Sequence, residues 1–538
     1  MTGALQDSVP GQGPGAGPGA GPGSRAPAGD GGAPPLLRGA RLALLTFALS
    51  LATFIEMLDS TVTNVAVPSI AGSLGVANSQ ATWVISSYSV SAAIAVPLTG
   101  WLSARVGESR LFIISVLLFT LTSILCAVAP NLELLVFFRS LQGLSSGPMV
   151  PLSQTILLRA FPPQKRVFAL ALWAMTVLLA PILGPVFGGW IIDRFSWPWI
   201  FFINLPIGIF AFAVCVSLLR RERAPARRPR IDVPGIVLLV VGVGSLQAVL
   251  DLGREYSWFD SSLIVTLAVV AALSLSALLI WESAETQPVI DLSLFRDRTF
   301  TFGVVITSLG MMAFSVIGVI FPLWLQTVMG YTAMQAGMAS APLGILAFVF
   351  SLLIGIYLKK LDARMVTTFG FLVFAAVLWW NAHFTLTMTF WQIVTPRLIQ
   401  GIGLPCFFIP LTAAIVSRVP DHKLAAASGL SNFLRTVSAA FGTALSITWW
   451  DSRAAFHYGT LRQSVTSASD GTNLFVQSVH DAGLATGPLP VIREVVQQQS
   501  YMMATNDLFY MASIVCVGLA ATMWLTRPAR VSGVNAGH

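Results

Sequence analysis

The stretch LLVFFRSLQGLSSGPMVPLSQTILL, residues 134–158, is a long apolar run with one charged residue, Arg139. A helix that crosses a bilayer needs about 20 mostly apolar residues, and this stretch meets that length. Its core, Arg139-Ser-Leu-Gln142-Gly143, recurs 258 residues later as Arg397-Leu-Ile-Gln400-Gly401. The same offset relates Pro162 to Pro420 and Lys165 to Lys423. The sequence therefore predicts membrane-spanning helices arranged in two repeats.

The composition indicates that lipid surrounds most of the chain. The 538 residues include 31 Lys and Arg and 23 Asp and Glu, so 10% are charged, whereas a soluble domain carries about 25%. Hydrophobic residues make up 55%, and the mean hydropathy is +0.77. These values exclude a cytosolic enzyme, a nucleic-acid-binding protein and a disulfide-stapled secreted domain. The four cysteines lie in apolar runs and the five histidines are scattered, so we expect no metal site and no cofactor.

Fourteen segments are long and apolar enough to span a bilayer. They are residues 42–66, 81–102, 111–129, 134–158, 168–192, 199–219, 233–252, 262–281, 300–321, 336–358, 365–384, 391–417, 427–450 and 507–526. The loops on the side of the termini carry 23 Lys and Arg, whereas the opposite loops carry five. Because positive charge accumulates on the cytoplasmic side, both termini are predicted to be cytoplasmic.

The repeat predicts the domain organisation of this all-α chain. The two copies of the repeated motif are eight spans apart rather than seven. This spacing indicates two six-helix bundles separated by two inserted helices. We assign the bundles to residues 40–219 and 300–526 and the insertion to 233–281, with a loop at 451–506 on the side opposite the termini. We predict cytoplasmic tails at residues 1–38 and 527–538 and a basic cytoplasmic loop at 220–232. The first tail is predicted to be disordered, because its first 35 residues include eleven Gly and seven Pro. Two repeats around a site at the bilayer midplane are typical of secondary transporters.

Charged residues inside membrane spans are costly and are candidates for function. Glu56, Asp59 and Thr63 have i, i+3, i+7 spacing, so we expect one polar stripe on the first span. Two shielded carboxylates that repel each other suit proton binding and release, because both effects raise their pKa values. Arg139 is either their counter-ion, which would oppose this rise, or a residue that holds helices together. The alternative is that either carboxylate is only a structural ion-pair partner of Arg139. Other polar residues within the spans are Asn64, Gln142, Asp251, Arg397, Gln400 and Arg435, and a structural role is favoured for Arg397, Arg435 and Asp251.

The fifth span contains a motif that suits either a hinge or close static packing. Gly184 and Gly188 form a ridge of small residues, beside Gly189, that permits close approach of another helix. Pro181 and Pro185 remove backbone hydrogen bonds and allow bending.

Two matches to enzyme motifs are interpreted as accidental. Gly143-Leu-Ser145-Ser-Gly147 fits G-x-S-x-G but lies in a predicted spanning helix, without the strand-to-helix turn that a nucleophilic serine requires. The four lysines lack the preceding glycine of a phosphate-binding loop, so no ATP-driven pump is expected. The chain is not expected to be an enzyme.

Several motifs together resemble the major facilitator superfamily, specifically the fourteen-helix drug:proton antiporters of the EmrB/QacA type and most closely the EmrB branch. They are Leu58–Pro68, Gly100–Gly107, Arg139–Gly143, Pro181–Gly189, Trp197–Gly208, Asp291–Phe295, Pro396–Gly403, Ser428–Arg435 and Arg453–Leu461. The Gly100–Gly107 motif departs from the family pattern, which usually has an acid at Ala104 and basic residues at Glu108 and Ser109.

The resemblance implies proton-coupled export of drugs or other amphipathic toxic compounds, with Asp59 and Arg139 in the coupling site. It also implies a bacterial inner-membrane protein that pairs with a periplasmic membrane-fusion adaptor and an outer-membrane channel, with segment 451–506 facing the adaptor. Two alternatives remain open: a dedicated exporter of a metabolite, siderophore or fatty acid, and a membrane receptor without transport. The intramembrane carboxylates and the prolines of the fifth span favour transport.

Overall fold

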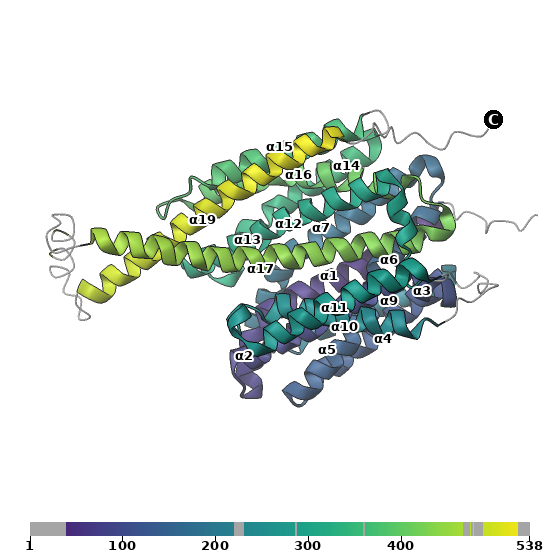
Figure 1. Ribbon diagram of the computed structural model, residues 1–538, viewed down its shortest axis with the longest axis horizontal. Coiled ribbons are helices and arrows are strands. Elements are labelled where there is room, and N and C mark those ends of the chain that lie inside the picture. The colour runs from purple at the N-terminus through teal and green to yellow at the C-terminus, as the bar shows by residue number, and fades with distance from the viewer. Residues whose placement is uncertain are drawn as a thin grey trace, which may run out of the picture. The chain divides into compact units, whose positions relative to one another are not determined.

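The computed structural model describes residues 39–219, 231–285, 288–358, 361–465, 474, 477 and 488–525. The predicted tails 1–38 and 527–538 lie outside these residues. Nearly all of the basic loop 220–232 also lies outside them. The described part is helical throughout, as predicted. Figure 1 shows the helices running side by side along the long axis of the view.

The first repeat contains α1 to α9. These helices are α1 Ala40–Leu74, α2 Asn78–Ala81, α3 Trp83–Val106, α4 Glu108–Ala127, α5 Leu132–Ser146, α6 Met149–Ala160, α7 Arg166–Arg194, α8 Trp199–Phe202 and α9 Asn204–Leu219. The insertion is α10 Val233–Leu252 and α11 Ser262–Ala284. The second repeat contains α12 Arg298–Thr327, α13 Ala333–Ser340, α14 Pro342–Tyr357, α15 Ala363–Asn381, α16 Phe390–Ser417, α17 Leu424–Ser464 and α19 Pro488–Thr522.

Short 3-10 turns join some of these helices, and two of them repeat the offset found in the sequence. Pro163–Lys165 precedes α7, and Asp421–Lys423 precedes α17, so the turns are separated by 258 residues. The remaining turns are Trp258–Asp260, Leu292–Arg296 and Met523–Leu525. The internal repeat is therefore present in the fold as well as in the motif.

The helices account for all fourteen predicted spans. Twelve described helical segments are long and apolar enough to cross a membrane. The span predicted at 134–158 consists of α5 and α6, which are separated at Gly147-Pro148, so each piece is short. The span predicted at 427–450 lies within α17, a helix of 41 residues that continues beyond the apolar part.

Glycines of the repeated motif hold equivalent helix pairs together. A Cβ atom on Gly143 of α5 would overlap the Tyr88 carbonyl oxygen of α3, and one on Gly401 of α16 would overlap the Leu343 carbonyl oxygen of α14. The two repeats meet through α7 with α14 and through α3 with α17. The inserted helix α10 packs against α3 and α17, and α11 packs against α10.

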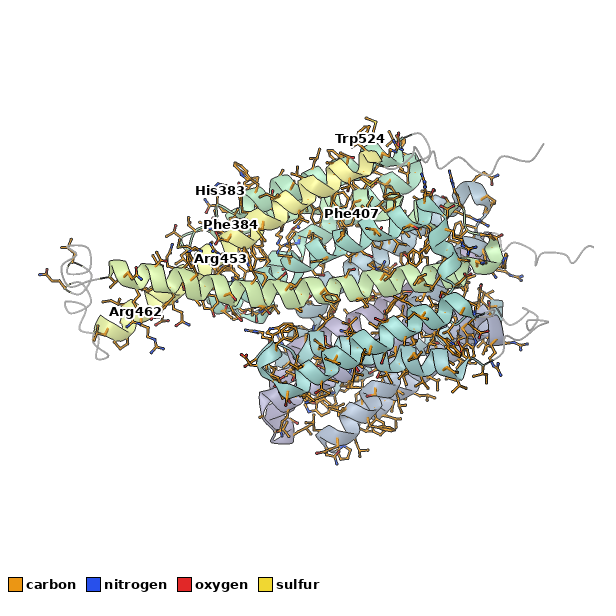
Figure 2. The ribbon with its side chains drawn as sticks, in the orientation of Figure 1. His383, Phe384, Phe407, Arg453, Arg462 and Trp524 are labelled. Atoms are coloured by element: carbon orange, nitrogen blue, oxygen red, sulfur yellow. The ribbon has the colours of Figure 1, made fainter. Side chains whose placement is uncertain are left out.

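Segment 451–506 differs from the loop that the sequence predicts. Residues 451–464 continue α17 as a helix, and residues 488–506 form the first part of α19. The two helices pack on each other, and Figure 1 shows them extending past the other helices at one end. Figure 2 shows Arg453 and Arg462 on this extension, which we call the α17–α19 hairpin, and Trp524 at the opposite end of α19.

Candidate functional site

A cavity of about 1020 Å³ lies between the two repeats. Its lining comes from helices of both repeats and from the inserted α10. Six of the predicted site residues line it: Glu56, Asn64, Arg139, Pro181, Asp251 and Arg435. The lining also includes Arg254, Glu255 and Trp258, which belong to the connection between α10 and α11. The cavity therefore extends toward the end of the bundle that carries this connection.

Asp59 and Arg139 form a buried ion pair beside the cavity. Arg139 Nη1 lies 2.5 Å from Asp59 Oδ2, and each side chain is 1% exposed. Arg139 also donates to the Gln142 Oε1 atom at 2.7 Å and, through Nε, to the Val84 carbonyl at 3.1 Å. A buried charge that loses its partner is strongly destabilising, so neither member can leave this pair without compensation.

The other carboxylate oxygen of Asp59 is held by amide groups. Asn204 Nδ2 donates to Asp59 Oδ1 at 2.7 Å, and Gln142 Nε2 donates to the same atom at 3.3 Å. Both amides also donate to Ser123 Oγ, at 3.3 and 2.8 Å. Sequence reasoning did not select Asn204 or Ser123 as site residues. The available signal was a polar residue inside each of the apolar runs 199–219 and 111–129.

Glu56 has different surroundings from Asp59, although both lie on α1. Glu56 lines the cavity, whereas Asp59 is absent from its lining. Glu56 Oε1 accepts a hydrogen bond from the Tyr88 hydroxyl at 3.4 Å, and Oε2 is buried without a hydrogen-bond partner. The Tyr88 ring also lies under the Arg139 guanidinium, 4.2 Å from its centroid. The third residue of the stripe, Thr63, donates to the Asp59 carbonyl at 2.7 Å.

The second repeat has the arginine but lacks its carboxylate. Arg397 Nη1 donates to Gln400 Oε1 at 2.7 Å, which matches the Arg139–Gln142 contact. Its Nη2 atom donates to the carbonyl of Ile317, and Ile317 follows Asp59 at the repeat offset of 258 residues. The guanidinium lies 3.3 Å from the Phe321 ring centroid, and no described carboxylate forms an ion pair with it. The two repeats are thus electrostatically unequal.

Two further charged residues line the cavity opposite α1. The Arg435 guanidinium of α17 lies over the Phe408 and Trp173 rings, 5.1 and 5.9 Å from their centroids. Asp251 of α10 accepts a hydrogen bond from Gln247 at 2.9 Å. Since cations over aromatic faces are attracted by the ring electrons, Arg435 is held in place without a carboxylate contact.

The glycines of α7 bring it close to α1. A Cβ atom on Gly184 would overlap Thr61 Oγ1, and one on Gly188 would lie 3.2 Å from Val62 Cγ1. A Cβ atom on Gly189 would approach only Met334, at 4.0 Å. Pro181 and Pro185 both lie inside α7, which continues through them from Arg166 to Arg194. The ridge formed by Gly184 and Gly188 therefore packs directly on the helix that carries Glu56 and Asp59.

Several ion pairs lie at the end of the bundle where α7 and α17 begin. Across the repeats, Arg166 Nη1 lies 3.4 Å from Asp421 Oδ1, and Arg159 donates to the Asp421 carbonyl. Arg159 also pairs with Glu108 at 2.8 Å, which gives a partner to the residue that departs from the family motif.

A second pair at this end joins Lys423 Nζ to Asp291 Oδ2 at 2.7 Å. Partial burial alone would raise the pKa of Asp291, but the charge and hydrogen bonds of Lys423 and Ser293 hold this pKa below its ordinary value. Among the described residues, no group of His, Cys, Asp and Glu could hold a metal ion.

Comparison with known proteins identifies close relatives. The chain is 45% identical over 497 residues to the probable multidrug resistance protein EmrY of Escherichia coli, covering 92% of this chain and 97% of that one. It is 43% identical over 503 residues to the multidrug export protein EmrB of the same organism, covering 93% and 98%. It is 44% identical over 506 residues to the fatty acid resistance protein FarB of Neisseria gonorrhoeae, covering 94% and 99%.

Solved structures and the family model give the same classification. The proton:xylose symporter XylE has the same fold, with a TM-score of 0.57 at 14% identity, covering 90% of this chain and 96% of that one. The model of the Major Facilitator Superfamily matches residues 49–443. The chain is therefore a multi-pass membrane transporter rather than an enzyme, and it belongs to the major facilitator superfamily, among exporters of the EmrB type.

Proposed function

We propose that this protein is a proton-coupled antiporter that exports drugs or other amphipathic toxic compounds. The observation that carries the proposal is the buried Asp59–Arg139 pair next to the cavity between the repeats. The name of EmrB, a multidrug export protein, supports the direction of transport, and the names of EmrY and FarB, which are resistance proteins, agree with it. Asp59, Arg139 and Glu56 form the proposed coupling site, and the prolines and glycines of α7 allow the movement.

The geometry suggests how proton binding would change the site. Asp59 accepts hydrogen bonds from three side chains in its ionised form. A proton on this carboxylate would remove its attraction for Arg139, which already lines the cavity. Arg139 would then be free to approach Glu56 or a bound substrate. Proton binding at Asp59 and the charge presented to the cavity are coupled in this scheme, which is what an antiporter requires.

The cavity lining supports an amphipathic substrate. Met57, Phe314, Phe408 and Ile447 supply apolar surface, and Glu56, Asp251 and Arg435 supply acidic and basic groups. Such a lining fits bulky apolar compounds that carry one polar or charged group. A fatty acid is a second candidate substrate, favoured by the similarity to FarB and by Arg435, which could pair with its carboxylate.

We further propose that the protein is the inner-membrane part of a tripartite pump, with both termini in the cytoplasm. The similarity to EmrB and the excess of positive charge on the side of the termini support this orientation. The α17–α19 hairpin would then project into the periplasm, where it could contact a membrane-fusion adaptor that leads to an outer-membrane channel. Deletion of residues 466–487, which join its two helices, should weaken co-purification with the adaptor if the hairpin is the contact.

Transport in proteoliposomes with an imposed pH gradient tests the coupling. One proton moving through 100 mV releases about 2.3 kcal/mol, enough to maintain roughly a fiftyfold gradient of a neutral substrate. Asp59→Asn keeps the size of the side chain but cannot bind a proton, so accumulation against a gradient should be abolished while substrate binding persists. Asp260→Asn, at an exposed aspartate outside the cavity lining, is the matched control. Wild-type accumulation by Asp59→Asn would place the coupling site elsewhere.

A further inference from the structure

A second cavity, of about 680 Å³, lies within the second repeat, far from the site described above. It is formed where α12 and α15 begin and where α16 ends, so it lies at the end of the bundle at which α1 also begins. Four arginines line it: Arg296, Arg298, Arg364 and Arg418. We call it the arginine pocket.

Carboxylates of the described residues do not balance the positive charge of the arginine pocket. Asp297 is the one acidic residue in its lining. Asp297 Oδ1 accepts from the Thr299 and Phe300 backbone amides, at 2.6 and 3.2 Å, and so caps the start of α12. None of the four arginines forms an ion pair with a described carboxylate. The pocket therefore carries an excess of three positive charges over its single carboxylate.

Arg364, a lining residue of the pocket, has hydrogen-bond donors that the described protein does not satisfy. Its Nε and Nη2 atoms are buried and have no hydrogen-bond partner. Buried guanidinium donors are normally paired, because leaving a charged donor without a partner costs free energy. A planar fork of donors matches the oxygens of a phosphate group. The orphaned donors thus indicate a ligand that accepts hydrogen bonds and carries negative charge.

The repeat shows that the fold does not need arginine at two of these four positions. Arg298 begins α12, and its equivalent at the offset of 258 residues, Ala40, begins α1. Arg418 lies two residues before Pro420, and its equivalent, Ala160, lies two residues before Pro162. The first repeat forms the same helix ends with alanine at both positions. Arg298 and Arg418 are therefore additions to the second repeat, whereas Arg296 has an arginine, Arg38, at its equivalent position.

The surroundings of the pocket are apolar and exposed. Phe302 of its lining is 44% exposed, and Met365, next to Arg364, is 62% exposed. Trp524 follows the lining residue Met523 and is 59% exposed at the end of α19 (Figure 2). Tryptophan is enriched where a membrane meets water, and basic pockets between helices at that depth bind lipid headgroups.

From these observations we propose that the arginine pocket binds the phosphate group of an anion, as carried by the headgroup of an acidic phospholipid or by free phosphate. Arg364 would donate to the phosphate oxygens from inside the pocket, and Arg298 and Arg418 would contribute charge at its mouth. A headgroup bound here would hold together the ends of α12, α15 and α16.

Native mass spectrometry of the full chain in detergent tests the proposal. Phosphatidylglycerol, cardiolipin and phosphatidylcholine are titrated separately into the wild type and into the double variant Arg364→Gln, Arg418→Gln. The double variant should bind the two acidic lipids about thirtyfold more weakly, since it removes two arginines and each arginine near a headgroup contributes about 1 kcal/mol. The matched control is Arg41→Gln, Arg110→Gln, which removes two exposed arginines at the same end of the first repeat. Its affinity should change less than twofold.

Competition by inorganic phosphate distinguishes the two sources of the ligand. Displacement of the acidic lipid at millimolar phosphate supports a phosphate site that free phosphate also fills, and resistance to displacement supports the headgroup. Equal weakening in the pocket and control variants, or equal binding of phosphatidylcholine, would overturn the proposal. The variant Arg364→Lys, Arg418→Lys keeps the charge and should retain most of the lipid binding. It replaces the glutamine variant in the test if the glutamine variant does not elute as a folded protein.

Discussion

At the scale of single residues, the proposed coupling site contains two carboxylates with different surroundings. Asp59 is enclosed by Arg139, Gln142 and Asn204, whereas Glu56 faces the cavity and retains an oxygen without a partner. A carboxylate that is enclosed by donors suits proton coupling, and one that lines a binding cavity suits contact with a positively charged substrate. The two residues can therefore be separated by experiment.

Glu56→Gln should weaken the binding of lipophilic cations without abolishing proton-driven export. The lost charge contact should raise the dissociation constant of a cationic substrate about tenfold, or ~1.4 kcal/mol. A neutral substrate of similar size should bind within threefold of the wild type. Equilibrium binding of the two substrates to purified protein measures both values. An equal loss for both substrates would contradict a charge contact at Glu56.

At the scale of helices, the packing of α1 on α7 depends on Gly184 and Gly188, which face α1, and not on the neighbouring Gly189. Gly184→Ala should lower the melting temperature and the transport rate, because its Cβ would overlap Thr61 Oγ1. Overpacking of this kind costs about 1–3 kcal/mol. Gly189→Ala is the control, since its Cβ would approach only Met334 at 4.0 Å. Thermal unfolding in detergent compares the two, and equal melting temperatures would contradict the packing argument.

The spans and the repeat could be predicted from the sequence, because apolar length and a repeated motif are local signals. The helical state of residues 451–464 and 488–506 could not be predicted in this way, since their polar composition resembles that of a loop. The contact of Asn204 with Asp59 joins residues 145 positions apart, and only the packing of α9 beside α1 brings them together. The candidate coupling residues were accessible because charge inside an apolar span is conspicuous, whereas neutral partners such as Asn204 are not.

At the scale of the whole molecule, the contacts of Asp421 join the two repeats at one end of the bundle. Asp421→Asn should shift the population toward states in which that end is open. The Asp421 side chain is 65% exposed, so the shift should be at most about fivefold, as expected for an exposed pair worth up to about 1 kcal/mol. Spin labels at Arg110→Cys and Arg418→Cys would measure this shift as a larger population of long label-to-label distances. Asp260→Asn should leave the distribution unchanged, and an unchanged distribution in Asp421→Asn would contradict the role of this contact.

The proposed orientation in the membrane gives a second prediction at this scale. An impermeant thiol reagent added to intact cells should label Arg462→Cys on the α17–α19 hairpin and spare Arg110→Cys at the other end. The four native cysteines are buried, so the background should be low. Permeabilised cells should show labelling at both positions. Labelling of Arg110→Cys in intact cells would contradict the proposed orientation and indicate the opposite one.

The length of α17 has a mechanical consequence. One uninterrupted helix carries Arg435 at the cavity and Arg462 on the hairpin. At about 1.5 Å per residue, the two positions are about 40 Å apart along the axis. A tilt of α17 by about 10° at the cavity would sweep its outer end through about 7 Å, if the helix stays straight over that length. A partner bound to the hairpin would therefore move with each transport cycle. Because the helix transmits movement in both directions, that partner could also slow the cycle from outside the membrane.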